Sequence, residues 1–188
     1  IEVASARENP RVLNGQIWIY AGLAPGLLQW VSLAIQQKVP LVVGTTGLAE
    51  SEYASLQKTS REIPLFYSPN FSLGIALLKK LAVDVAQKFH PHAQVDLIET
   101  HHAGKRDAPS GTALWIAKSM EPRNCQIHSL RVGNVVGEHA LTFNTSAERI
   151  CLSHVAHDLS AFGRGALTAA LFLLQQPTGF YTMEDLVK

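Results

Sequence analysis

The sequence of 188 residues lacks the features that mark several large classes of protein. Its two cysteines, Cys125 and Cys151, are too few for a disulfide framework, so we expect reduced thiols in a cytoplasmic setting. No apolar run approaches the roughly 18 residues of a membrane span, and the N-terminus has no secretory-signal pattern. A net charge of +1 without a basic run argues against nucleic acid as a partner. We therefore expect a globular protein that binds neither membrane nor nucleic acid.

Two sequence motifs are also missing. No His-Glu-x-x-His or Cys-x-x-Cys spacing supports a metal site, although four histidines, at positions 90, 92, 101 and 102, are close together. No Gly-x-Gly-x-x-Gly loop, which holds a dinucleotide pyrophosphate, occurs near the start of the chain. We predict no metal site.

Apolar periodicity predicts two regions of different character. Up to about residue 70, short strands alternate with helices, which is typical of a parallel sheet. A long amphipathic helix then has Leu73, Leu77, Leu81 and Val85 on one stripe. From Val95 onward the strands are denser, which indicates an open sheet with few crossover helices. The expected strands after Val95 are 127–132, 140–143 and 149–155, the earlier ones are 17–20, 41–43 and 65–66, and the expected helices include 25–38, 49–61, 72–89 and 159–174.

The segment from Glu99 to Thr112 gathers proton donors, a cation and a helix start. His101 and His102 follow an apolar run, so we expect them at the carboxyl end of a strand with side chains on opposite faces. Lys105 adds a positive charge. The Ser-Gly-Thr sequence then opens a predicted helix whose free backbone N–H groups suit a carboxylate or phosphate. Together these residues predict acid/base chemistry on a small anionic substrate.

Each of these elements also has a plain structural interpretation. Histidines at strand ends are often only hydrogen-bonded, a single lysine such as Lys105 usually faces solvent, and Ser110 is an ordinary helix cap. Only the combination favours a functional site. Arg131, Glu138 and His139 form a second polar group, which an exposed strand face explains as well, and we leave them outside the catalytic set.

The segment 99–113 closely resembles the signature of the dihydrodipicolinate reductase family, also called 4-hydroxy-tetrahydrodipicolinate reductases, of lysine biosynthesis in bacteria and plants. The resemblance is specific, because further blocks follow in the family's order over nearly the whole chain. These blocks are 43–48, 68–72, 131–139, 162–171 and 179–185.

The resemblance implies an oxidoreductase that reduces 4-hydroxy-tetrahydrodipicolinate to tetrahydrodipicolinate with NADH or NADPH, in the diaminopimelate route to lysine. It assigns His101 as the catalytic acid/base and Lys105 as a second proton-donating or charge-stabilising group. The residues implied to bind the cyclic dicarboxylate substrate are His102, Ser110, Gly111 and Thr112.

On the cofactor side, the family uses two turns to line the nicotinamide half of the dinucleotide. These are the turns after the strands at 41–43 and 65–66. From the residues alone, these turns also have plain interpretations. Thr45 or Thr46 would cap the next helix, Phe71 would be a core aromatic, and Asn70 would hydrogen-bond the backbone of its own turn. The implied cofactor-binding residues are Gly44, Thr45, Thr46, Ser68, Pro69, Asn70 and Phe71.

The implied fold is α/β, with a truncated Rossmann-like dinucleotide-binding domain and an α+β substrate and tetramerisation domain with an open mixed sheet. We expect residues 1–70 in the first domain, 71–160 in the second, and a C-terminal helix and tail, 161–188, returning to the nucleotide domain. The family's first βαβ unit is absent, and we expect it to precede Ile1, because half a Rossmann sheet would expose a hydrophobic edge. The link between Met120 and Cys125 is also shorter than in the family. The implied assembly is a homotetramer.

Three functional classes remain open. The first is the reductase. The second is a catalytically silent relative that keeps substrate binding and assembly but lacks nucleotide binding, as the missing glycine loop would suggest. The third is another two-domain nicotinamide oxidoreductase, of the homoserine or aspartate-semialdehyde type. The intact His-His-x-x-Lys and Ser-Gly-Thr series speaks against the third class.

Overall fold

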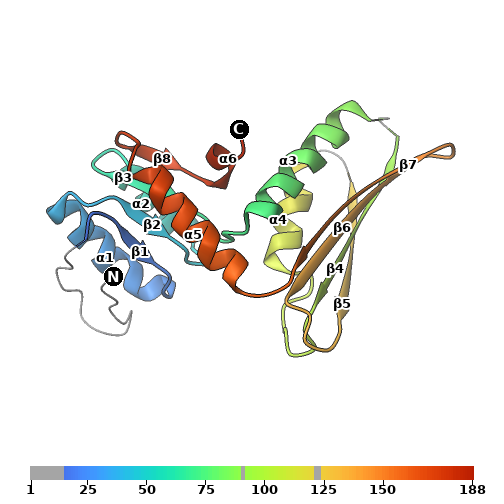
Figure 1. The fold of residues 1–188 in the computed structure, drawn as a ribbon, viewed down its shortest axis with the longest axis horizontal. Helices are drawn as coiled ribbons and strands as arrows, with labels where there is room; N and C mark the ends of the chain where they lie inside the picture. The colour runs from blue at the N-terminus through green and yellow to red at the C-terminus, as the bar shows by residue number, and fades with distance from the viewer. Residues whose placement is uncertain (1–14, 90–91, 121–123) are drawn as a thin grey trace. The chain divides into compact units, whose positions relative to one another are not determined.

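The computed structural model describes residues 15–89, 92–120 and 124–188 (Figure 1). It forms two compact units, one of Ile1–Leu73 with Phe162–Lys188 and the other of Gly74–Ala161. The start of the chain and most of the short link after Met120, at 121–123, lie outside the described residues. Within the described part, no helix is long and apolar enough to cross a membrane.

The first unit is built on a parallel sheet. The strand order is β1-β2-β3-β8, and all three pairings are parallel. Alternating strands and helices predict this arrangement, because each helix returns the chain to the end of the sheet where the previous strand began. The strands are β1 (Trp18–Tyr20), β2 (Leu41–Val43), β3 (Pro64–Tyr67) and β8 (Gly179–Tyr181).

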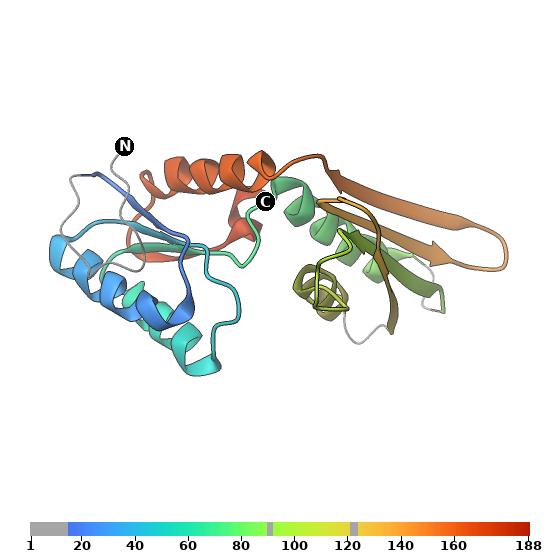
Figure 2. The ribbon, with the colours of Figure 1, turned by 90° about the horizontal axis from the view of Figure 1, so that it is seen from below.

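Helices cover both faces of this sheet. In both views α1 (Ala24–Gln37) and α2 (Glu50–Thr59) lie on one face and α5 (Ser160–Leu173) on the other (Figure 2). The middle strand β2 is therefore buried along its whole length, as its Leu-Val-Val sequence predicts. The last helix is the short α6 (Met183–Leu186).

The second unit contains a mixed four-stranded sheet in the order β5-β4-β6-β7. The central strand β4 is parallel to β5 and antiparallel to β6, and β6 is antiparallel to β7. The predicted open sheet with few crossovers is thus confirmed. The strands are β4 (Gln94–His101), β5 (Cys125–Arg131), β6 (Gly137–Asn144) and β7 (Arg149–Ala156).

Two helices, α3 (Leu73–Lys88) and α4 (Gly111–Ser119), pack against one face of this sheet (Figure 1). The face that α3 buries differs from the expected stripe. Leu73, Leu77 and Leu81 are exposed, and of that stripe Val85 alone packs against the core. The buried face is one position further round the helix, where small side chains let it approach the sheet. Its residues are Ile75, Ala76, Leu78, Ala82 and Ala86.

Two elements were not predicted, β8 and α6. The strand β8 is only three residues long and half-buried, so no alternation of apolar and polar residues shows in it. It pairs with β3, on which Leu65 lies opposite Phe180. This strand follows α5 along the chain and completes the sheet of the first unit.

Candidate active site

One face of the mixed sheet changes from apolar to polar along its length. At one end Leu97 and Leu141 are fully buried in the core beneath the two helices. Two residues further along β4, Glu99 lies opposite Ser129 of β5 and opposite His139 of β6. Because side chains two residues apart share a face, the pairing of the strands brings these polar groups together next to the core.

Glu99 is the centre of this polar group. Its side chain is fully buried and accepts two hydrogen bonds from the Arg131 guanidinium, 2.8 Å from Nη2 to Oε1 and 3.1 Å from Nη1 to Oε2. The backbone N–H of Ser110 donates a further bond to Oε1 at 3.2 Å. Burial alone would raise the pKa of Glu99, but the hydrogen bonds, chiefly that from Arg131, lower it to about 2. Glu99 is therefore a buried, ionised carboxylate.

His101, the last residue of β4, is fixed by this carboxylate. Its Nδ1 donates to Glu99 Oε2 over 2.5 Å. Burial lowers the pKa of His101, and Glu99 opposes that shift without reversing it. The other ring nitrogen, Nε2, lies beside Gly137, where an added Cβ would come within 3.3 Å of it. The hydrogen bond to Glu99 thus selects Nε2 as the nitrogen that can exchange a proton with a ligand.

His139 lies next to His101 on the same face. The two rings meet edge to face, with centroids 5.4 Å apart. His139 is only 4% exposed, and neither ring nitrogen has a hydrogen-bond partner among the described residues. Burial, followed by the neighbouring charge of His101, lowers the pKa of His139 to about 4. His139 is therefore uncharged near pH 7 and lines the site beside His101.

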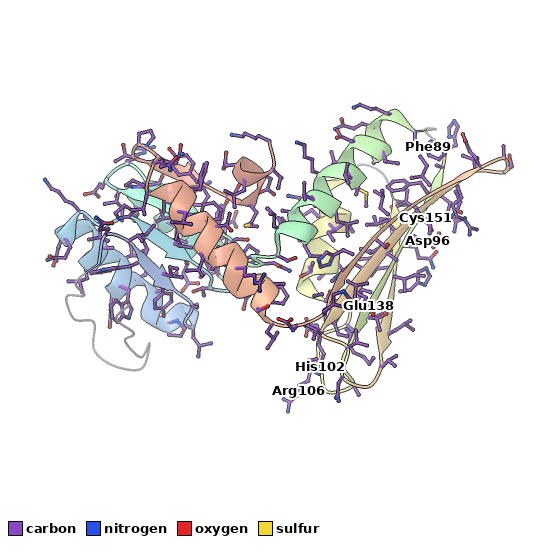
Figure 3. All side chains as sticks on the ribbon, in the orientation of Figure 1. Phe89, Asp96, His102, Arg106, Glu138 and Cys151 are labelled. Atoms are coloured by element: carbon purple, nitrogen blue, oxygen red, sulfur yellow. The ribbon has the colours of Figure 1, made fainter. Side chains whose placement is uncertain are left out.

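The loop after β4 carries the predicted cation. Lys105 Nζ forms an ion pair of 2.8 Å with Asp107 Oδ1. Arg131 also donates to the backbone carbonyl of Asp107, which ties this loop to the Glu99 network. His102 follows the end of β4 and is exposed, whereas His101 is buried. Figure 3 shows His102 and Arg106 together at the loop end of the sheet.

At the start of the helix after this loop, one backbone N–H group already has a hydrogen-bond partner within the chain. Ser110 is the N-cap of α4, and its hydroxyl accepts a hydrogen bond from the backbone of Ala113 at 3.2 Å. The plain interpretation of Ser110 as a cap is therefore correct. Gly111, the first residue of the helix, has open space where a Cβ would lie, and Thr112 is half-buried beside it. The space beside Gly111 is thus open, and the positive end of the helix dipole favours an anion there.

In the first unit, the turn after β2 is held by the chain. Gly44 donates its N–H to the carbonyl of Tyr20 at 2.7 Å, and the buried Thr45 hydroxyl donates to the carbonyl of Gly22 at 2.9 Å. The interpretation of Thr45 or Thr46 as a helix cap is wrong. Helix α2 begins at Glu50, and its N-cap is Ala49, whose N–H donates to the Glu52 carboxylate.

The turn after β3 lies beside it, because β2 and β3 are parallel neighbours and Ser68 donates its N–H to the carbonyl of Val43. Asn70 accepts from the backbone of Ser72, and Phe71 is buried against Phe66 with ring centroids 6.1 Å apart. Phe71 is thus a core aromatic, and Asn70 stabilises its own turn. Pro69, between Ser68 and Asn70, is exposed.

These two turns suit the nicotinamide half of a dinucleotide. Both follow the carboxyl ends of neighbouring parallel strands, where such cofactors bind in α/β sheets. Thr46 is exposed at the first turn, whereas Gly44 makes room for Phe71, whose ring would lie 2.9 Å from an added Cβ. Within residues 15–89, 92–120 and 124–188, no group of His, Cys, Asp or Glu is arranged to hold a metal ion. His90 lies outside the described residues.

Three residues of the site were not predicted, namely Glu99, Arg131 and His139. Glu99 received no role, and Arg131 was left outside, although the structure places both in direct contact with the His101 network. Residues 99 and 131 are far apart in the chain, and only the parallel pairing of β4 with β5 brings them together. The Glu-x-His spacing within one strand was the available signal, since it puts both side chains on one face.

Two family models together match most of the chain. Residues 12–71 match the family model described as dihydrodipicolinate reductase, N-terminus, and residues 74–187 match the model for its C-terminus. A solved structure, dipicolinate-bound dihydrodipicolinate reductase from Paenisporosarcina sp. TG-14, has a TM-score of 0.78 at 22% identity, covering 90% of this chain and 73% of that one. This likeness confirms the fold.

Curated relatives named 4-hydroxy-tetrahydrodipicolinate reductase match most of the chain. The protein of Caldanaerobacter subterraneus subsp. tengcongensis is 41% identical over 179 residues, covering 84% of this chain and 71% of the relative. That of Xanthomonas campestris pv. campestris strain B100 is 43% identical over 167 residues, covering 88% and 70%. The resemblance seen in the sequence is confirmed, and the chain belongs to the dihydrodipicolinate reductase family.

Proposed function

We propose that this protein reduces 4-hydroxy-tetrahydrodipicolinate to tetrahydrodipicolinate with NADH or NADPH, in the diaminopimelate route to lysine. The observation that carries the proposal is the buried pair of Glu99 and His101, 2.5 Å apart, in the same unit as Lys105 and the start of α4. The reaction needs a proton donor of fixed orientation and positive charge near a dicarboxylate. The bound cofactor supplies the hydride, the acid supplies one proton, and the 4-hydroxyl group leaves as water.

His101 acts as the acid. Its Nδ1–H stays hydrogen-bonded to Glu99, so the proton that is transferred is the one on Nε2. Burial lowers the pKa of His101, which makes the imidazolium a stronger acid, while Glu99 keeps the ring protonated to a higher pH than burial alone would allow. After the transfer the neutral ring is the form that its buried surroundings favour.

Lys105 and the start of α4 hold the substrate. The ammonium of Lys105 stabilises negative charge that develops on the conjugated ring as hydride arrives. The backbone N–H groups at Gly111 and Thr112 bind a carboxylate, favoured by the positive end of the helix dipole. His102 contacts the substrate from the exposed side of the loop, and Ser110 supports the site as the cap of the helix.

The nicotinamide half of the cofactor binds at the two turns of the first unit. Their position at the carboxyl ends of β2 and β3 supports this assignment. Thr46 is exposed toward solvent and available to the cofactor, Gly44 makes room for Phe71, and the buried residues keep the turns in shape. The residues assigned here are Gly44, Thr45, Thr46, Ser68, Pro69, Asn70 and Phe71.

A homotetramer in the cytoplasm completes the proposal. The sheet of the second unit has α3 and α4 on one face, while its other face carries exposed apolar side chains at Ile98, Leu130 and Val155. Such a surface suits burial between subunits. Both cysteines are free thiols, which is consistent with a reducing compartment.

The test is the oxidation of NADH and of NADPH in the presence of a freshly prepared aldehyde–pyruvate condensation product. Oxidation that depends on both the protein and the condensation product supports the proposal. Binding of pyridine-2,6-dicarboxylate without any oxidation would favour the catalytically silent relative instead. The intact network around His101 gives no support to that alternative, since a silent protein has no need of an oriented acid.

A further inference from the structure

The carboxylate of Asp107 occupies the groups to which the substrate is assigned. Its Oδ1 lies 2.8 Å from Lys105 Nζ, and the backbone of Gly111, the first residue of α4, also favours the charged form of Asp107. These partners hold the pKa of Asp107 below its usual value, chiefly through the bond from Lys105. An internal carboxylate therefore lies between the cation and the helix start.

The side chain of Asp107 is free to leave this position. It is 56% exposed, so an alternative rotamer can place the carboxylate in water at little cost in solvation. The backbone at the same residue is held separately, because Arg131 donates to the Asp107 carbonyl. A rotation of the side chain alone would free Lys105 and Gly111 while the loop and the Glu99 network stay in place.

We propose that the Asp107 side chain is an internal substitute for a substrate carboxylate. It interacts with Lys105 and the start of α4 until the substrate displaces it. The inference rests on the proposed function, because that function assigns the two groups to substrate binding. Displacement makes every anion compete with Asp107. A monocarboxylate that displaces Asp107 only replaces one carboxylate by another and gains little. A dicarboxylate gains further contacts through its second carboxylate. Asp107 is thereby a specificity-determining residue.

The test compares pyridine-2,6-dicarboxylate with pyridine-2-carboxylate as ligands of the wild type and of Asp107→Asn, by calorimetry. The asparagine keeps the size of the side chain and removes its charge. We expect the Kd of the dicarboxylate to fall about two- to fivefold, the effect of removing an exposed ion pair, and that of the monocarboxylate to fall at least as much. In turnover, KM should fall while kcat changes little.

Two further variants separate this role from a structural one. Asp107→Glu retains the charge and should bring the Kd back toward the wild-type value. Asp84→Asn removes an exposed carboxylate that pairs with Lys88 on α3, and it should leave both ligands unaffected. Unchanged or weaker dicarboxylate binding by Asp107→Asn, with a wild type that binds and turns over, would overturn the inference alone. A wild type that neither binds nor turns over would overturn the proposed function and this inference together.

Discussion

Arg131 and Glu99 form a two-pronged ion pair across β4 and β5, with the fully buried carboxylate oxygens 2.8 and 3.1 Å from the guanidinium nitrogens. The same carboxylate accepts the hydrogen bond from His101 Nδ1. The arginine therefore neutralises a charge that the fold buries in order to orient the proposed acid. Breaking this pair should affect both stability and catalysis.

Arg131→Met should destabilise the protein by about 3 kcal/mol, because it leaves the buried Glu99 carboxylate without its main counter-charge. The measurement is the free energy of unfolding in urea. The double variant Glu99→Gln with Arg131→Met should recover much of this loss, since neither charge then remains buried. Additive losses in the double variant would show that the pair is not coupled.

Glu99→Gln alone should shift the pH dependence of turnover. Glu99 raises the pKa of His101 against the effect of burial, so removing its charge lowers that pKa further. An acid with a lower pKa is deprotonated sooner as pH rises, and the alkaline limb of kcat/KM against pH should move to lower pH. A limb that stays in place would indicate that another group supplies the proton.

His101→Gln and Lys105→Ala should each reduce kcat by about two orders of magnitude, with little change in cofactor affinity. Matched controls are His157→Gln and Lys118→Ala, which alter exposed residues of the same types outside the site. Both controls should retain wild-type turnover. Near-normal rates in the two site variants would contradict their proposed roles.

His139 should make stability depend on pH. Its pKa is about 4 in the folded protein, against about 6.5 in an unfolded chain. The unfolded state therefore binds the extra proton first as pH falls, so the contribution is complete above pH 6.5 and is lost as pH falls towards 4. The loss is on the order of 3 kcal/mol. His139→Asn should flatten the wild-type slope of unfolding free energy over this range. An equal slope in the variant would assign the dependence to other groups.

Two glycines of α5 offer a matched pair. An alanine Cβ at Gly165 would lie 1.7 Å from the carbonyl oxygen of Phe71, whereas at Gly163 it would meet no atom within 4 Å. Gly165→Ala should therefore cost about 3 kcal/mol and disturb the turn assigned to the cofactor. Gly163→Ala should stabilise the helix by roughly 0.5–1 kcal/mol. Melting temperatures that move in the same direction for both variants would contradict this interpretation.

Much of the fold could be predicted from the sequence, because the information is local. The run Leu41–Val43 and the helix signals on either side of it indicate the parallel sheet without reference to the rest of the chain. The buried face of α3 could not be predicted in this way. Leucine and alanine positions form two possible stripes there, and only packing against the sheet selects the alanine-containing one.

The same distinction applies to the site. His101, Lys105 and Ser110 lie in one continuous segment whose order of residue types is itself informative. The partner of Glu99 comes from another strand, and its identity depends on which residues of β4 and β5 lie opposite each other. The sequence therefore indicates His101 as the proposed acid, but it does not indicate the pairing of Glu99 with Arg131 that fixes His101 in place.

The pairing of β4 with its neighbours also limits how this protein can change in evolution. Adding one residue to β4 before Glu99 would turn the acid and its carboxylate partner to the opposite face of the sheet, away from Arg131 and His139. A substitution in the core can be compensated nearby, but such an insertion would separate the whole network at once. We expect insertions and deletions in this family to be confined to the loops, while the length of β4 from Val95 to His101 stays constant.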